Sequence, residues 1–147
     1  MEKLEKILVA HDFSENSVYA FTYAFTMAKQ LNVRLIVLHV VHEAIDLRGF
    51  YFPHISFDVL DKDAADRAKE MMEGFCERTF TEFKNFESAV VIGIPHVEIL
   101  KKAEQEKVSM IVMGTQGLTG VAHMLFGSTA ERVVRNTKLP VLVVPLP

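Results

Sequence analysis

The chain has 147 residues, half of them hydrophobic, which is the size and balance of an ordinary globular domain, and we expect one domain over residues 1–147. A net charge of −3 with 16 scattered basic residues excludes the electrostatic footprint of a nucleic-acid-binding protein. The single cysteine, Cys76, excludes an intrachain disulfide, and no apolar run reaches the ~20 residues of a membrane span, so we expect a cytoplasmic protein.

The first part of the chain alternates strand and helix patterns. Residues 4–10 contain the apolar run ILVA and stop before Asp12, which predicts a short strand. Ser14 can cap a helix whose apolar positions share one face and which ends at Asn32. Residues 33–41 are β-branched and almost continuously apolar, as expected of a central parallel strand.

The middle of the chain is less regular. Residues 42–57 include Gly49 and Pro53 and follow neither a helix nor a strand period, so this segment stays irregular and without an assigned role. Residues 58–83 carry apolar side chains near helical spacing, which predicts one long amphipathic helix.

Strand and helix patterns return in the second half of the chain. Residues 87–92 predict a third strand, and Pro95 stands near the first turn of a helix that runs through Glu106. Residues 108–113 predict a fourth strand, which leads into a glycine-rich loop.

A helix beginning at Ser128 and the apolar run Val141–Val144 complete the pattern. The alternation predicts an α/β fold, a flavodoxin-like or Rossmann-like three-layer sandwich with helices on both faces of a five-stranded, mainly parallel sheet. We expect the strands of this sheet in the order 3-2-1-4-5. Prolines frame the last strand, which is typical of a sheet edge. An apolar edge would expose unpaired backbone, so we expect two copies to pair there in a homodimer.

The glycine-rich loop carries the clearest chemical signal. Gly114, Gly117 and Gly127 can turn their backbone N–H groups toward one point, because glycine tolerates positive φ and has no side chain to block a ligand. The helix that begins at Ser128 adds free N–H groups and the positive end of its dipole. The loop therefore predicts a phosphate site, although neither the Rossmann G-x-G-x-x-G pattern nor the Walker A motif is present.

The predicted strand ends indicate where the rest of such a site lies. Ligands of doubly wound sheets bind beyond the carboxyl ends of the strands, where the strand order reverses. Asp12, Val40 and Gly114 stand at or near such ends, so we expect them to converge.

The spacing Gly114-Thr-Gln-Gly117, nine residues, Gly127-Ser128 resembles the ATP-binding branch of the universal stress protein family. That branch carries G-x-x-G, nine residues, then G-[S/T] directly after the fourth strand. The resemblance extends over the whole chain, through the segments VAHDFS, LIVLHV, MIVMGTQG and GSTAERVVRNTKLPVLVVP.

The resemblance implies binding roles for the loop and the helix that follows it. Gly114, Gly117, Gly127 and Ser128 would hold the ribose and phosphates, largely through backbone N–H groups. Thr129 would add its own N–H group at the helix start.

The resemblance also assigns residues of the strands and names a ligand. Asp12 would lie near the ribose and the metal-phosphate region, Val40 would meet adenine through its backbone, and Met113 would border the pocket. The implied ligand is ATP, with ADP and AMP as alternatives, and Mg²⁺ would bind through the phosphates. No residue is assigned as catalytic or as a direct metal ligand.

These observations predict a cytoplasmic ATP-binding stress-response or signalling module that acts as a nucleotide-dependent homodimeric switch, with a protein partner left open. The loop from Gly114 to Ser128 contains no Lys or Arg, which favours binding over phosphoryl transfer. Two alternatives stay open: a slow ATPase or phosphotransferase in which Asp12 orients water or Mg²⁺, and a ligand-free dimeric interaction scaffold.

Two of the site residues also have purely structural interpretations. Ser128 with Glu131 three residues on forms the sequence of a capping box, which stabilises a helix without any ligand. Asp12, standing before Ser14, commonly makes a turn or caps a helix.

Overall fold

The computed structural model describes residues 3–43, 57–116 and 126–147 of the chain. Five strands form one sheet: β1 (Lys6–Ala10), β2 (Arg34–His42), β3 (Phe86–Gly93), β4 (Met110–Gly114) and β5 (Val141–Val144). Four helices accompany them: α1 (Glu15–Leu31), α2 (Phe57–Thr79), α3 (Pro95–Glu106) and α4 (Ser128–Asn136). All neighbouring strands are parallel and their order is β3-β2-β1-β4-β5, which confirms the predicted fold class and strand order.

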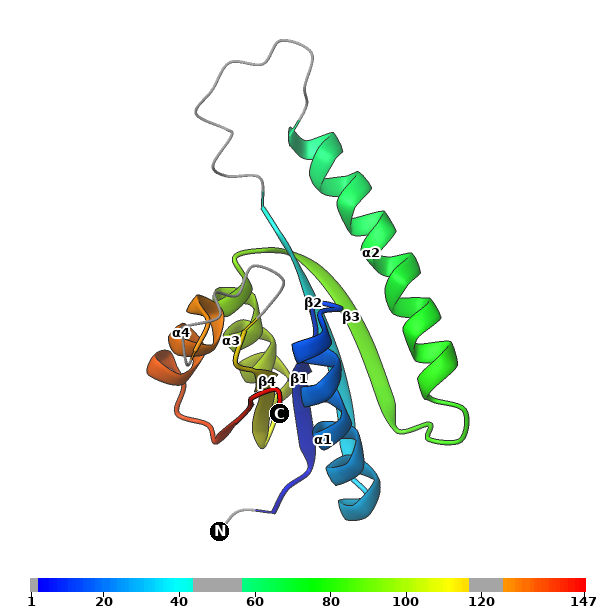
Figure 1. Ribbon diagram of the computed structural model, residues 1–147, viewed down its shortest axis with the longest axis vertical. Coiled ribbons are helices and arrows are strands. Elements are labelled where there is room, and N and C mark those ends of the chain that lie inside the picture. The colour runs from blue at the N-terminus through cyan, green and yellow to red at the C-terminus, as the bar shows by residue number, and fades with distance from the viewer. Residues whose placement is uncertain (1–2, 44–56, 117–125) are drawn as a thin grey trace.

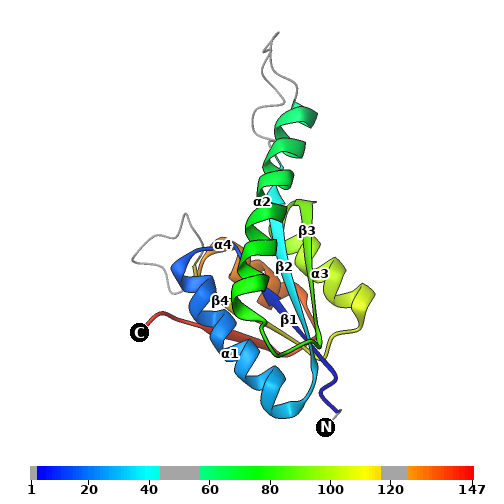
Figure 2. The same ribbon diagram turned by 90° about the vertical axis from the view of Figure 1, so that its right-hand side faces the viewer.

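Helices cover both faces of the sheet and give three layers (Figure 1 and, turned by 90°, Figure 2). On one face, Val9 packs in a buried cluster with Phe21 of α1 and Met72 of α2. On the other, Leu8 packs with Ile99 of α3, in a cluster to which α4 also contributes. Neighbouring residues of a strand point to opposite faces, so a strand covered on both sides must be apolar throughout.

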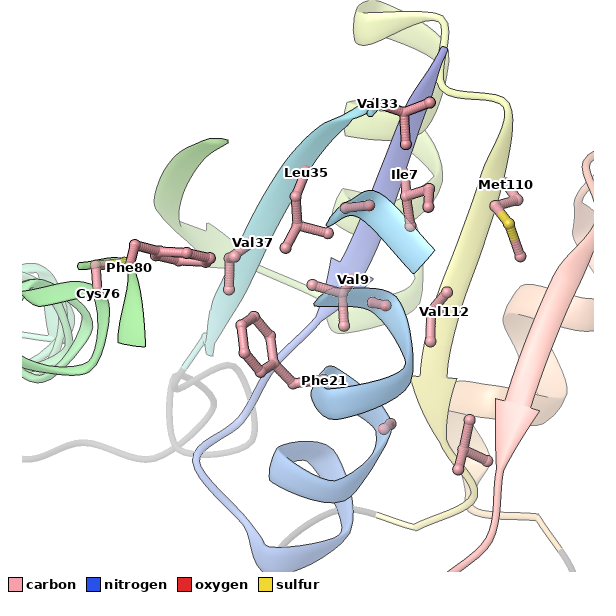
Figure 3. Close-up of a cluster of buried hydrophobic side chains, with 14 of the residues drawn as sticks. Ile7, Val9, Phe21, Val33, Leu35, Val37, Cys76, Phe80, Met110 and Val112 are labelled. Carbon is pink, nitrogen blue, oxygen red and sulfur yellow. The ribbon is translucent and has the colours of Figure 1, made fainter. Parts of the chain in front are cut away.

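The centre of the sheet is fully enclosed. Side chains from Ile7 to Val9 of β1 are 0% exposed, and β2 is buried to the same degree between Leu35 and Val37. Figure 3 shows the cluster on the side of α1, where Phe21 lies beside Val9. The long apolar run that predicted a central strand is therefore the consequence of burial on both faces.

Three helix ends follow the predicted local chemistry. The hydroxyl of the N-cap Ser14 accepts the Ser17 N–H at 3.2 Å, and Asn32 ends α1 in the left-handed region at φ 53°. Pro95 is the first residue of α3, where its missing N–H leaves no helical bond unmade.

The predicted end of the long second helix is wrong. That helix stops at Thr79 instead of residue 83, because the next aromatic side chains leave the helix and join the core. Phe80 stacks on Phe86 with ring centroids 3.9 Å apart, and Phe83 packs against Phe25 at 5.4 Å. Aromatic residues three apart continue the helical period in the sequence while packing outside the helix.

The boundaries of the irregular segment also shift. His42 still belongs to β2, whose last residue pairs with Gly93 of β3, and Phe57 already belongs to α2. The remainder of the segment, residues 44–56, lies outside the described residues. None of the described helices has the length and apolar character needed to cross a membrane.

We expect Leu8→Ala to lower the free energy of unfolding by about 2–5 kcal/mol, because Leu8 is fully buried between the sheet and α3. Urea denaturation measures the change. Leu31→Ala is the matched control, since Leu31 is 49% exposed and its truncation is expected to cost less than about 1 kcal/mol. Equal losses in the two variants would contradict the assignment of Leu8 to the core.

Candidate functional site at the carboxyl ends of β1 and β4

The strand register brings four of the predicted site residues to one edge of the sheet. Val9 of β1 pairs with Val112 of β4, so Met113 and Gly114 continue along the carboxyl end of β1 toward Asp12. On the other side of β1, Ala10 pairs with Leu38, which puts Val40 two residues further along β2 at the same edge. This edge is where the strand order reverses, between β1 and β4.

The two described ends of the glycine-rich loop lie against each other. The Gly127 N–H donates to the carbonyl oxygen of Thr115. A Cβ atom on Gly127 would come within 3.0 Å of that oxygen and within 3.3 Å of the Gln116 Cα atom. Gly127 is therefore glycine because of a close backbone approach. Gly117, the remaining predicted site residue, lies outside the described residues.

The start of α4 differs from the capping box that its sequence allowed. Gly127, not Ser128, is the N-cap, and the first helical bond runs from the Glu131 N–H to the Gly127 carbonyl at 3.1 Å. The capping-box interpretation is wrong because Ser128 stands one position inside the helix, while the Glu131 carboxylate pairs with Arg135 at 2.9 Å.

The consequence is a helix start that no described side chain caps. Ser128 is exposed and Thr129 half-buried at the first two positions of α4. Their N–H groups precede the first helical bond, so they have no acceptor within the helix. Such groups, at the positive end of the helix dipole, suit an anion.

Asp12 has the structural role that the sequence allowed. Its Oδ1 atom accepts the Ser14 N–H at 3.0 Å, and its own N–H donates to Ser17 Oγ at 3.1 Å. The turn orders the carboxylate at the carboxyl end of β1. A ligand contact by Asp12 would thus use a side chain that the turn already holds in place.

Phe13 adopts a backbone conformation that the sequence did not indicate. Its φ of 64° lies in the left-handed region, which is uncommon for a bulky residue and costs on the order of 1–3 kcal/mol. The ring lies 4.9 Å from the ring centroid of His11 and 4.8 Å from that of His39. The rings of His11 and His39 thus pack against Phe13 at the turn between β1 and α1.

His11 faces the core between α1 and α2. Its side chain is 3% exposed, its ring centroid lies 4.4 Å from that of Phe75, and its Nδ1 atom lies 3.4 Å from Ser17 Oγ. Burial lowers the pKa of His11 to about 4, and the opposing attraction of Asp12 only partly offsets it. His39 Nδ1 donates to the His11 carbonyl at 2.8 Å, which satisfies that side of its ring.

Asn16 is a site residue that sequence reasoning missed. It lies on the first turn of α1, 8% exposed, and its Nδ2 atom donates to Thr115 Oγ1 at 3.3 Å. A Cβ atom on Gly114 would overlap Asn16 Oδ1. The available signal was the spacing of Asn16 with Ala20, Ala24 and Ala28, which puts a polar residue at the head of an apolar helix face.

Comparison with known proteins identifies the family. The sequence model of the universal stress protein family matches residues 3–145. This chain belongs to the universal stress protein family. Universal stress protein MJ0577 of Methanocaldococcus jannaschii is 31% identical over an alignment of 152 positions, gaps included. The alignment covers 95% of this chain and 94% of that protein. Universal stress protein YxiE of Bacillus subtilis is 32% identical over 144 residues, and the match covers 95% of this chain and 97% of that protein.

Solved universal stress protein structures share the fold. MJ0577 superposes with a TM-score of 0.82 at 31% identity over 99% of both chains. UspA from Lactobacillus plantarum superposes with a TM-score of 0.83 at 26% identity, over 98% of this chain and 99% of its own. A universal stress protein solved in complex with cAMP superposes with a TM-score of 0.61 at 26% identity, over 98% of both chains.

The buried imidazole predicts a pH dependence of stability. The folded pKa of His11, about 4, lies below the ordinary value of 6.5, so the unfolded chain binds a proton between these values that the folded chain does not. This contribution to stability is complete above pH 6.5 and is lost as pH falls toward 4, amounting to about 3 kcal/mol.

Urea denaturation from pH 7 to pH 4 measures this loss. His11→Phe, which keeps a ring but cannot titrate, is expected to flatten the profile over that range. His42→Phe, at an exposed position, leaves His11 intact and is expected to retain the wild-type slope. A His11→Phe profile as steep as the wild-type profile would contradict the assignment.

Proposed function

We propose that this universal stress protein binds ATP at the carboxyl edge of its sheet and acts as a nucleotide-dependent homodimeric switch in stress response or signalling. ADP and AMP are the alternative ligands. The proposal includes a single nucleotide-binding domain over residues 1–147 and a cytoplasmic location, with which the single buried cysteine, Cys76, is compatible.

The observation that carries the proposal is the uncapped start of α4 beside the end of β4. The Gly127 N–H bond to Thr115 holds this helix start next to the strand end. An anion there would meet the N–H groups of Ser128 and Thr129 and the positive end of the helix dipole. A phosphate chain is an anion of suitable size and charge for such a position.

The neighbouring strand ends support a nucleotide over a bare phosphate. Val40 is a half-buried apolar residue at the same edge, where a base could pack, and Met113 lies in the buried cluster behind it, 4% exposed. Asp12 offers a carboxylate to the ribose side. The proposed binding residues are those of the family resemblance: Asp12, Val40, Met113, Gly114, Gly117, Gly127, Ser128 and Thr129. A relative in the same family was solved with cAMP, also an adenine nucleotide.

The donor chemistry also fits Mg²⁺ held through the phosphates. Mg²⁺ prefers oxygen ligands and commonly uses one or two carboxylates together with phosphate oxygens and water. The Asp12 carboxylate, ordered by its bond to Ser14, is a suitable oxygen donor at this edge. The ion would neutralise phosphate charge that the loop itself does not, because residues 114–128 contain no Lys or Arg.

Backbone recognition of phosphate predicts different effects for two substitutions at one position. Ser128→Pro removes both the N–H and the hydroxyl, yet keeps the helix, because proline is favoured as first helical residue and Gly127 is extended at ψ 165°. Ser128→Ala removes only the hydroxyl. Calorimetry with ATP on nucleotide-stripped protein is expected to show a loss of tenfold or more for Ser128→Pro and at most about threefold for Ser128→Ala.

Wild-type protein that takes up no ATP at millimolar concentration would overturn the proposed function in favour of a ligand-free scaffold. Equal losses in the two Ser128 variants would instead contradict recognition through the backbone. Circular dichroism of both variants checks that α4 remains folded.

The position of β5 supports the homodimer. It is an edge strand that pairs with β4 through Ile111 and Val141, and its outer edge has no partner in the described part of the chain. Light scattering at micromolar concentration is expected to give twice the chain mass of 16.6 kDa. Leu142→Lys, which puts a charge on the edge strand, is expected to shift the mass toward the monomer. A monomeric wild-type protein would refute pairing at this edge.

A further inference from the structure

Thr115 connects the starts of α1 and α4, two helices that lie on opposite faces of the sheet. Its hydroxyl oxygen accepts from Asn16 Nδ2 on the first turn of α1, at 3.3 Å. Its carbonyl oxygen accepts from the Gly127 N–H, at the N-cap of α4. One residue thus joins Asn16 to Gly127 through two hydrogen bonds.

The Asn16 carboxamide is unusually placed for a residue on a helix face. It is 8% exposed, and its Oδ1 atom finds no hydrogen-bond donor among the described residues. Burying an unpaired polar atom is costly, and a smaller apolar residue would avoid that cost. A buried carboxamide at such a cost indicates a role for the bond that it makes among the described residues, to Thr115.

The position of Asn16 also restricts the backbone that leads into the loop. Its side chain occupies the space where a Cβ atom of Gly114 would stand, and its backbone oxygen would lie 3.2 Å from such an atom. Glycine leaves a backbone free to adopt many conformations. The neighbouring carboxamide fills the space beside Gly114, so the chain passes close to Asn16 as it continues from β4 to Thr115.

We propose that Asn16 is a positioning residue for the start of α4. Acting through Thr115, it fixes the carbonyl that holds Gly127 and thereby the N–H groups of the first turn of α4. The role in ligand binding rests on the proposed function. The role in holding Gly127 does not, because it concerns only bonds within the chain.

The test is a double-mutant cycle with Asn16→Ala and Thr115→Val, read by two measurements on the full chain. Hydrogen exchange followed by NMR reports the Gly127 amide, and calorimetry reports the affinity for ATP. Loss of one hydrogen bond is expected to speed Gly127 exchange and weaken ATP binding by about three- to tenfold in either variant. Because both variants remove the same bond, the double variant is expected to be no worse than the more impaired single variant.

Asn136→Ala is the matched control. It removes a carboxamide bond of 2.7 Å to the Arg132 carbonyl at the far end of α4 and is expected to leave both readouts unchanged. Exchange at Val9, in the centre of the sheet, reports the global fold in every variant. Should Asn16→Ala also destabilise the sheet, Thr115→Val, which preserves side-chain shape, still tests the same bond.

The outcomes separate the two proposals. Faster Gly127 exchange in a protein that does not bind ATP would support the positioning role and reject the proposed ligand. Unchanged Gly127 exchange in both single variants would overturn the positioning role, whatever the affinity for ATP. Effects that multiply in the double variant would overturn it as well, because Asn16 and Thr115 would then act independently.

Discussion

The arrangement of the whole molecule depends on the parallel pairing of β1 with a strand on each side. β2 lies on one side and β4 on the other, and the chain crosses between the two halves of the sheet only after β3. Because of this reversal, α1 and α4 leave adjacent strand ends toward opposite faces of the sheet. The first turns of α1 and α4 therefore diverge at the carboxyl ends of β1 and β4. Ligands of such folds bind at this edge of the sheet.

The two helix starts at this edge are chemically different. The α1 start is capped by the Ser14 hydroxyl, which accepts the N–H of the buried Ser17, a group without a partner inside the helix. The α4 start has Gly127 in the equivalent position, which stabilises a helix almost as well as serine but has no side chain to occupy the N–H groups. A glycine cap therefore leaves one more N–H group of the first turn available to an external anion at α4 than a serine cap leaves at α1.

Sequence patterns predicted the elements and the layers because these depend on long apolar runs and their spacing. The strand order was also predicted, but it does not follow from apolar runs, since the same alternation is compatible with several orders. They failed where a choice between neighbouring positions depends on distant partners. The end of α2 depends on aromatic contacts of Phe80 with Phe86, and the N-cap of α4 depends on the approach of Gly127 to Thr115. The bond of Asn16 joins residues 99 positions apart, beyond the reach of any local pattern.

The contact between Gly114 and Asn16 limits the order in which substitutions at these two positions can be tolerated. A side chain at position 114 would overlap the Asn16 carboxamide, so Gly114→Ala is disfavoured while Asn16 is present. Shortening Asn16 first would remove the two nearest atoms, Oδ1 and Cγ, while its backbone oxygen would still lie 3.2 Å from the new Cβ atom. The two positions are therefore epistatic: the same pair of substitutions is far more accessible by one route than by the other.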